Sequence, residues 1–263
     1  MLEFATGALD SPPDRRDYPV EQFLPADVLA GAAAPLPDEW SFEGLMQPVR
    51  HQGAEGTCVG HALASGLMGY QQRLDDQEVL SVRDVYEGAR RLQPPPAGVQ
   101  GAYPRAALEW ARTRGVCLES EWPYQPNAAG MPVITAENGR ARNKLATYSR
   151  VAPTPPAIRE AMYWHGPALV VVRTDGGWAR PKDGRIVSAG LVGGAHAITL
   201  IGWSASRGCW RIRNSWGPDW ADGGNAWLPW SWAISEAWVA TPAKGSPPPL
   251  VDWLRRVAPW LGV

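Results

Sequence analysis

A single cysteine lies where a glycine-rich loop meets an apolar run with helical spacing. Residues 49–63 read VRHQGAEGTCVGHAL, so glycines crowd the chain before Cys58 and apolar residues follow it. The N-terminus of a helix favours thiolate over thiol, and the thiolate is the nucleophilic form. This position therefore suits covalent catalysis, although most free cysteines are simply buried as small hydrophobic residues.

Of the four histidines, His196 is the best placed to act as a base. His51 and His61 lie too close to Cys58 along the chain to be directed at it, and His165 is expected at the end of a helix. His196 lies in VGGAHAITLIGW, where a glycine loop enters an apolar strand. A strand would hold the imidazole rigidly at the edge of a cleft.

One strand later, the segment RIRNSWGPDW supplies a partner for this imidazole. Asn214 could accept a hydrogen bond from His196 and so fix its tautomer. Trp216, two residues further on, would keep water away from the pair. The three residues together with Cys58 have the composition of a nucleophile, a base and an orienting group.

Composition excludes several other classes of protein. The chain has 263 residues with 45% hydrophobic and 19% charged residues, which is ordinary for a globular protein of one large domain or two lobes. A net charge of -1 without a basic run argues against a nucleic-acid partner. We see neither a signal peptide nor a membrane-spanning stretch.

The cysteine count argues against a disulfide framework. Cys58, Cys117 and Cys209 are an odd and low number for this length, and we expect no cofactor or metal because no second Cys/His pair completes a site with Cys58 and His61. We expect a cytoplasmic protein, or one exported without a cleaved signal peptide, with a reducing compartment favoured.

The first half of the chain should be helical. We expect one buried helix from Cys58 to Tyr70, a second capped by Ser81 with Asp84 in its first turn, and a third over residues 104–114.

The second half should be mostly β-structure after a short helix near residues 156–165. Five segments read as strands and imply an antiparallel sheet or open barrel. These are residues 166–174, 184–190, 196–203, 209–216 and 225–230.

The motifs QGAEGTC, GGAHAITLIGW and NSWG, in this order, resemble those of the papain-like cysteine peptidases. The segments LSVRDVYEGAR and GAYPRAALEWARTRGVCLESEWPY extend the resemblance to about residues 36–240, and DSPPDRRDYP resembles the lead-in of bacterial members. The resemblance implies an α+β fold of two lobes, a helical left lobe and an antiparallel, β-barrel-like right lobe, with the active-site cleft between them.

Three regions follow from this comparison. Residues 1–35 are expected to form an extended arm, and residues 36–243 the peptidase domain, whose helical lobe covers about 50–125 and whose β lobe covers about 130–240. Residues 244–263 read as a Pro-rich linker and a short amphipathic helix, which packs back on the domain or serves as a docking element. We expect a monomer.

The resemblance also assigns catalytic roles. Cys58 would be the nucleophile, His196 the general base and acid, and Asn214 the residue that orients His196. Gln52 would donate its side-chain amide to the oxyanion, together with the backbone N–H of Cys58. Six residues would contact the substrate. These are Gly101, Ala102, Tyr103, Pro104, Gly194 at the floor of the main specificity pocket, and Trp216.

The sequence departs from the family at several positions. Glu55 and Val99 stand where members usually carry the two halves of a disulfide, so we expect other contacts to hold the loop before Cys58, with Glu55 as the hypothesised partner. Ala102 replaces a glycine and adds a methyl group beside the substrate. We expect no long inhibitory pro-segment. Residues 1–35 are expected to pack on the β lobe, and a partial cover of the cleft is the alternative.

The function implied is that of an endopeptidase that acts on peptide or protein substrates through a thioester. An acyltransferase or deamidase would use the same Cys-His-Asn groups, but such sequences more often orient the histidine with an acid. A catalytically silent binding module would usually lose Cys58 or His196, and both are present.

Overall fold

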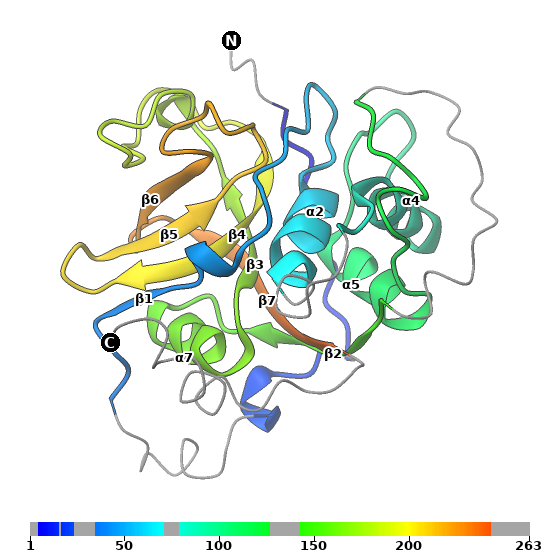
Figure 1. The fold of residues 1–263 in the computed structure, drawn as a ribbon, viewed down its shortest axis with the longest axis horizontal. Helices are drawn as coiled ribbons and strands as arrows, with labels where there is room; N and C mark the ends of the chain where they lie inside the picture. Colours follow the sequence, from blue (N-terminus) through cyan, green and yellow to red (C-terminus); the bar gives the residue numbers. More distant parts are fainter. Residues whose placement is uncertain (1–4, 16, 24–34, 71–78, 127–142, 243–263) are drawn as a thin grey trace.

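The fold is described from a computed structural model over residues 5–15, 17–23, 35–70, 79–126 and 143–242. Figure 1 shows helices on one side, an antiparallel sheet on the other, and the N-terminal segment between them. The predicted C-terminal helix lies outside the described residues.

The helical part begins with the segment that carries Cys58. Helix α2, Cys58–His61, continues directly into a π-helical stretch, η3, Ala62–Leu67, and every residue of both is buried. Helix α4, Val82–Leu92, is capped by Ser81, whose hydroxyl accepts from the backbone N–H of Asp84, as predicted. Helix α5, Pro104–Thr113, has proline in its first turn, where a missing N–H costs nothing.

The second half forms an open antiparallel sheet in the order β2-β7-β3-β4-β5-β6, with β1 paired to β4. The predicted α+β fold with an antiparallel sheet is confirmed, and the described strands do not close into a barrel. Its strands are β1 Glu39–Ser41, β2 Leu145–Val151, β3 Ala168–Arg173, β4 Ala195–Ser204, β5 Cys209–Arg213, β6 Asn225–Pro229 and β7 Ile234–Pro242. Helix α7 is Pro155–His165, and the short 3-10 turns are η1 Val20–Phe23, η2 Glu43–Leu45 and η4 Gly176–Trp178.

The prediction of a strand over residues 184–190 is wrong. Gly184 and Gly190 have φ angles of +71° and +72°, so the chain turns at both ends of this segment. Arg185 makes only isolated bridges, to Lys182 and Trp227. The apolar Ile186 is buried without belonging to a strand.

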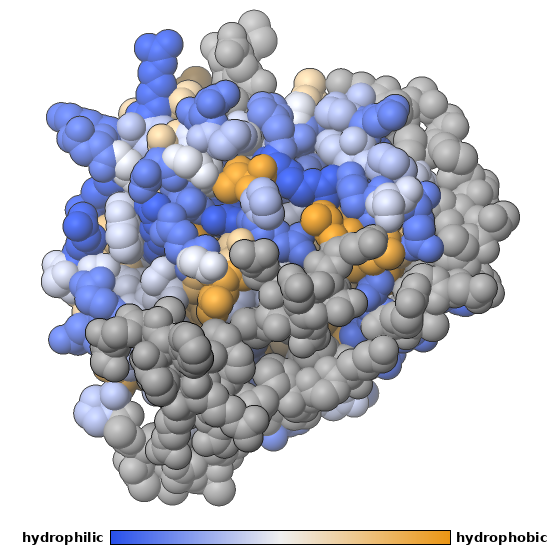
Figure 2. All heavy atoms as spheres, in the orientation of Figure 1, coloured by the Kyte–Doolittle hydropathy of each residue, from blue (hydrophilic) through white to orange (hydrophobic). Residues whose placement is uncertain are grey.

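Two hydrophobic clusters share the central strands of the sheet. Alternate side chains of β3 point to opposite faces: Leu169 and Val171 join the cluster of the helices, whereas Val170 and Val172 join the cluster of the β part. Burial on both faces explains the continuous apolar run of β3. The outer surface is mostly hydrophilic on the face in Figure 2.

Candidate active site

The nucleophile position is the first residue of α2. Cys58 is completely buried, and its sulfur accepts a hydrogen bond of 3.4 Å from the backbone N–H of Ala197, the residue after His196 on β4. The predicted thiol and the predicted base are therefore brought together across the boundary between helices and sheet. Cys117 and Cys209 are also free and buried.

The orientation of His196 is fixed by Asn214. The Nε2–H of His196 donates to Asn214 Oδ1 at 2.7 Å, and the backbone N–H of Ser215 donates to the same oxygen at 2.8 Å. This oxygen can only accept, so the neutral imidazole keeps its proton on Nε2 and leaves Nδ1 as the acceptor. Within the described residues, Nδ1 of His196 is buried and has no hydrogen-bond partner.

Trp216 covers the imidazole. Its ring stacks on that of His196 with a centroid distance of 4.7 Å and an interplanar angle of 26°. Trp178 meets His196 edge-on at 6.0 Å. These indoles pack over the imidazole beside its hydrogen bond to Asn214, and the shielding from water expected of Trp216 stays a prediction.

Gln52 lies in the loop before Cys58 with its amide held in one orientation. The hydroxyl of Ser215 donates to Gln52 Oε1 at 2.6 Å, so the Nε2 group is available as a donor on the other side. Nε2 donates to the carbonyl of Glu55 at 2.8 Å and to that of Ala5 at 3.2 Å. Ser215 thus supports both Gln52 and Asn214. The sequence analysis missed this residue, because nothing in the sequence shows that its hydroxyl reaches Gln52.

The N-terminal arm passes between the two parts of the molecule (Figure 1). Its Ala5 carbonyl accepts hydrogen bonds from the side chains of Gln52 and Trp216. The backbone N–H groups of Gly7 and Ala8 donate to the carbonyl of Ala195 at 3.2 and 3.1 Å. On the other side, Ala102 N–H donates to Gly7 and Leu9 N–H donates to Ala102, both at 3.0 Å. The arm therefore contacts both lobes, instead of packing on the β lobe alone.

The arm occupies several positions assigned to substrate. Ala8 pairs with Ala102 as a parallel bridge, and a Cβ on Gly101 would lie 2.4 Å from the Gly7 carbonyl. The side chain of Thr6 lies against Gly194, where an added Cβ would be 2.1 Å from its hydroxyl.

Tyr103 and Pro104 have a different place. Tyr103 is the N-cap residue of α5 and Pro104 begins the helix. Their contact with substrate stays a prediction. As the start of α5, they set the direction of the backbone after Ala102.

Burial favours the uncharged forms of Cys58 and His196. It raises the pKa of the Cys58 thiol to about 11, against the opposing effect of backbone N–H groups that include those of Ala197 and Gly7. It lowers the pKa of His196 to about 4, although the hydrogen bond to Asn214 favours the charged form. The thiolate expected from the helix N-terminus is thus disfavoured in this buried arrangement.

The other histidines do not reach the site as bases. His61 lies within the buried helical segment, its pKa lowered to about 3 mainly by burial, and its ring packs edge-on against Tyr124. His51 forms an isolated bridge with Trp216 through the backbone. His165 is the last residue of α7, as expected. No group of three or more His, Cys, Asp or Glu side chains among the described residues could hold a metal ion.

The two-lobed arrangement, with a cysteine at a helix start facing a histidine on a strand, is that of a papain-like fold. Residues 36–230 match the sequence model of the papain family of cysteine proteases. The chain belongs to this family.

Similar proteins agree with this assignment. The chain is 27% identical over 224 residues to caricain of Carica papaya, covering 78% of this chain and 59% of that protein. It is 24% identical to a cathepsin L-like proteinase of Phaedon cochleariae, covering 76% of this chain and 61% of that protein. The chain thus spans about three fifths of the length of these relatives.

A solved structure similar to this one is that of xylellain, a cysteine protease from Xylella fastidiosa. Its TM-score is 0.76 at 23% identity, with 90% of this chain and 96% of that chain covered. The cysteine protease CMS1MS2 of Carica candamarcensis, solved in complex with E-64, gives a TM-score of 0.61 at 22% identity and covers 78% of this chain and 99% of that one. At these identities the likeness establishes the fold.

Proposed function

We propose that the protein is a cysteine endopeptidase in which Cys58 is the nucleophile and His196 the general base and acid. The observation that carries this proposal is the His196–Asn214 hydrogen bond, which leaves Nδ1 as a proton acceptor next to the strand residue that contacts Cys58. An imidazole oriented in this way is ready to take the thiol proton.

In the proposed reaction, His196 Nδ1 takes the proton of Cys58 and the sulfur attacks the carbonyl carbon of the peptide bond. The oxyanion accepts hydrogen bonds from the amide of Gln52 and the backbone N–H of Cys58. His196 gives its proton to the leaving amine as the C–N bond breaks. Water, deprotonated by His196, then attacks the thioester, and the acid product leaves as the thiol re-forms.

The same proposal includes a latent state. The arm occupies the place of a substrate: the carbonyl of Ala5 takes the Gln52 amide, and Gly7 and Ala8 bridge the two lobes. The arm is anchored beyond the cleft by Arg105, which pairs with Asp14 and Asp17. A segment tethered in this way competes with substrate at a high effective concentration. Peptide hydrolysis therefore requires that residues 5–9 leave the cleft.

Gly7→Val is the variant that opens the site. A Cβ at residue 7 would lie 2.2 Å from the carbonyl oxygen of Gly56, and backbone cannot move aside as a flexible side chain can. The arm of this variant cannot take its place in the cleft.

The test uses a diverse peptide library with the wild-type chain and with Gly7→Val. We expect internal cleavage of peptides, visible as pairs of product masses that sum to substrate plus water. A mass change of a single glutamine to glutamate would indicate a deamidase instead, and joined products would indicate an acyltransferase. Absence of any turnover in Gly7→Val, with folding intact, would contradict the proposal.

A further inference from the structure

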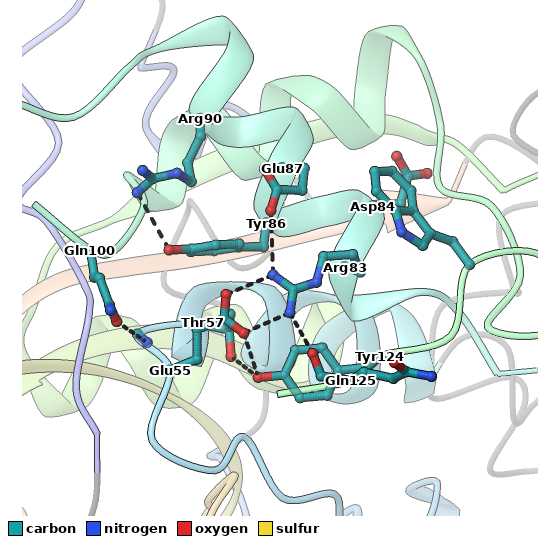
Figure 3. A network of polar contacts seen from close by, with 12 residues as sticks. Glu55, Thr57, Arg83, Asp84, Tyr86, Glu87, Arg90, Gln100, Tyr124 and Gln125 are labelled. Atoms are coloured by element: carbon teal, nitrogen blue, oxygen red, sulfur yellow. Dashed lines mark hydrogen bonds and ion pairs between the residues drawn. The ribbon is translucent and has the colours of Figure 1, made fainter. Parts of the chain in front are cut away.

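A buried arginine on α4 is directed at the loop that carries Gln52 (Figure 3). The side chain of Arg83 is 1% exposed, and its two terminal nitrogens bind the carboxylate of Glu55 at 2.7 and 2.6 Å. The guanidinium also donates to the carbonyl of Gln125 at 2.8 Å and to Glu87 at 3.3 Å. Burial of an ion pair costs desolvation, so its presence is weak evidence for a stabilising role.

Glu55 connects this arginine to the oxyanion-binding amide. The backbone carbonyl of Glu55 accepts the hydrogen bond from Gln52 Nε2 at 2.8 Å and one from the N–H of Thr57, also at 2.8 Å. A shift of Glu55 would therefore move the carbonyl that orients the Gln52 amide. It would also move Thr57, the residue just before Cys58, through the same carbonyl.

Tyr124 makes a second connection between the same groups. The guanidinium carbon of Arg83 lies 5.0 Å from the centre of its ring. The Tyr124 hydroxyl donates to the backbone carbonyl of Gln52 at 2.8 Å and lies 2.8 Å from the hydroxyl of Thr57. Arg83 thus braces both ends of the loop over residues 52–57.

The other edge of the cleft is tied to the same helix. Arg90, two turns after Arg83, donates to the carbonyls of Val99 and Gly101 at 3.2 and 2.7 Å. The N–H of Gly56 donates to Gln100 Oε1 at 3.1 Å (Figure 3). Helix α4 therefore links the segments around positions 55 and 99, where the resemblance implies a disulfide in other members.

We propose that Arg83 is a positioning residue of the oxyanion site, acting through Glu55 and Tyr124 on the side-chain amide of Gln52. The ion pair and its neighbours hold the loop over residues 52–57 in place of a covalent bridge. This inference rests on the proposed peptidase function, because the amide of Gln52 has its role only in that reaction.

The first test is Arg83→Met in the full chain carrying Gly7→Val. Because a displaced donor is felt in the transition state, kcat per active site should fall by about 10- to 100-fold with KM nearly unchanged. Affinity for a peptide aldehyde, whose adduct with Cys58 places an oxygen at the oxyanion site, should fall in parallel. Alkylation of Cys58 by iodoacetamide, which uses no oxyanion site, should keep its rate.

A matched control is Arg211→Met. Arg211 is another buried arginine that binds a carboxylate with two nitrogens, Glu43 at 2.8 Å for each contact, but it lies on β5 away from the loop. It should lower stability without lowering kcat per active site, where active sites are counted by titration with a peptide epoxide. Equal kcat losses in the two variants would assign Arg83 a merely structural role and overturn the inference.

The decisive comparison combines Arg83→Met with Gln52→Ala. If Arg83 acts through Gln52, adding Arg83→Met to Gln52→Ala should change kcat by less than about twofold, because interacting residues are not additive. Independent, multiplying effects would overturn the inference. Should Arg83→Met fold poorly, Glu55→Gln, which keeps the shape of the side chain, should give the same pattern.

Hydrogen exchange separates failure of this inference from failure of the proposed function. In the full chain, Arg83→Met should increase amide exchange in peptides that cover residues 52–57, a readout that needs no turnover. Unchanged exchange there would overturn the inference even if Gly7→Val hydrolyses peptides. Faster exchange in a chain that hydrolyses no peptide would place the failure with the proposed function.

Discussion

The side-chain amide of Gln52 donates a hydrogen bond of 3.2 Å to the backbone carbonyl of Ala5, a residue of the N-terminal arm. The indole of Trp216 donates to the same carbonyl, also at 3.2 Å. The group that is expected to hold a substrate oxyanion therefore binds the chain's own backbone. Ala8 forms an isolated parallel bridge with Ala102 and donates to the carbonyl of Ala195, so this segment is held by both lobes.

Removal of this contact should activate the protein. In Gly7→Val, the valine side chain collides with the backbone of Gly56, so residues 5–9 are displaced and we expect peptide hydrolysis at least about 10-fold faster than in the wild-type chain. Gly44→Val is the matched control, because a Cβ at that position meets nothing within 4 Å. Equal initial rates for all three chains would show that the arm does not limit access to Cys58.

Acid should favour release of the arm. With the arm in the cleft, burial lowers the pKa of His196 to about 4, whereas an exposed imidazole titrates near 6.5. The open form therefore binds a proton on His196 more readily. The contribution of His196 to the stability of the closed arm is full above pH 6.5 and should fall as pH drops towards 4 and then level off.

Hydrogen exchange of residues 5–9, corrected for the intrinsic effect of pH, measures this opening. The pH dependence should be weaker in His196→Ala, which removes the titrating group. Exchange that rises equally in wild type and His196→Ala would assign the effect to another group, such as His61, whose pKa burial lowers to about 3.

The oxyanion role of Gln52 predicts a loss confined to the chemical step. In the Gly7→Val chain, Gln52→Ala should lower kcat by about 100-fold with little change in KM, because the donor acts on charge that develops in the transition state. Gln47→Ala provides a control, since Gln47 is another buried glutamine nearby in sequence. Steady-state kinetics on one peptide substrate measure both constants. A Gln52→Ala chain that keeps its kcat would remove Gln52 from the mechanism.

Oxidising conditions should lower activity only through oxidation of Cys58 and should leave the stability of the fold unchanged. The three cysteines are free, and the loop before Cys58 is held by Arg83 and Glu55 instead of a disulfide. Thermal melts with and without dithiothreitol should therefore give the same Tm. Cys209→Ser should retain activity, because a hydroxyl can replace the thiol that donates to the carbonyl of Arg207. A Tm that falls in dithiothreitol would contradict the assignment of free thiols.

The candidate catalytic residues could be picked out from the sequence because each lies in a short local pattern. Cys58 follows a glycine-rich loop, His196 begins an apolar strand and Asn214 follows the next one, so sequence order already implied the site. The start of helix α4 could also be predicted, because Ser81 is a good N-cap residue. Of the predicted strands, that over residues 184–190 failed because the flanking glycines turn the chain.

The rest depends on contacts between segments far apart in the chain. Strands β2 and β7 pair with each other across about ninety residues and were not predicted, because their partners are not neighbours in sequence. Arg83 reads as a polar helix residue in the sequence, and its burial depends on partners distant in the chain, such as Glu55 and Tyr124. The arm shows no periodic pattern of apolar residues in the sequence. Its place in the structure depends on backbone hydrogen bonds to the distant residues Ala102 and Ala195, which no local pattern reveals.

The most direct test of the account is the site modified by a peptide epoxide in the Gly7→Val chain. Mass spectrometry should find one inhibitor per chain, attached to Cys58, with labelling lost in Cys58→Ser and strongly slowed in His196→Ala. Peptide hydrolysis should be abolished in both of these variants. Attachment to Cys117 or Cys209, or peptide hydrolysis that survives in Cys58→Ser, would contradict the assignment of Cys58 as the nucleophile.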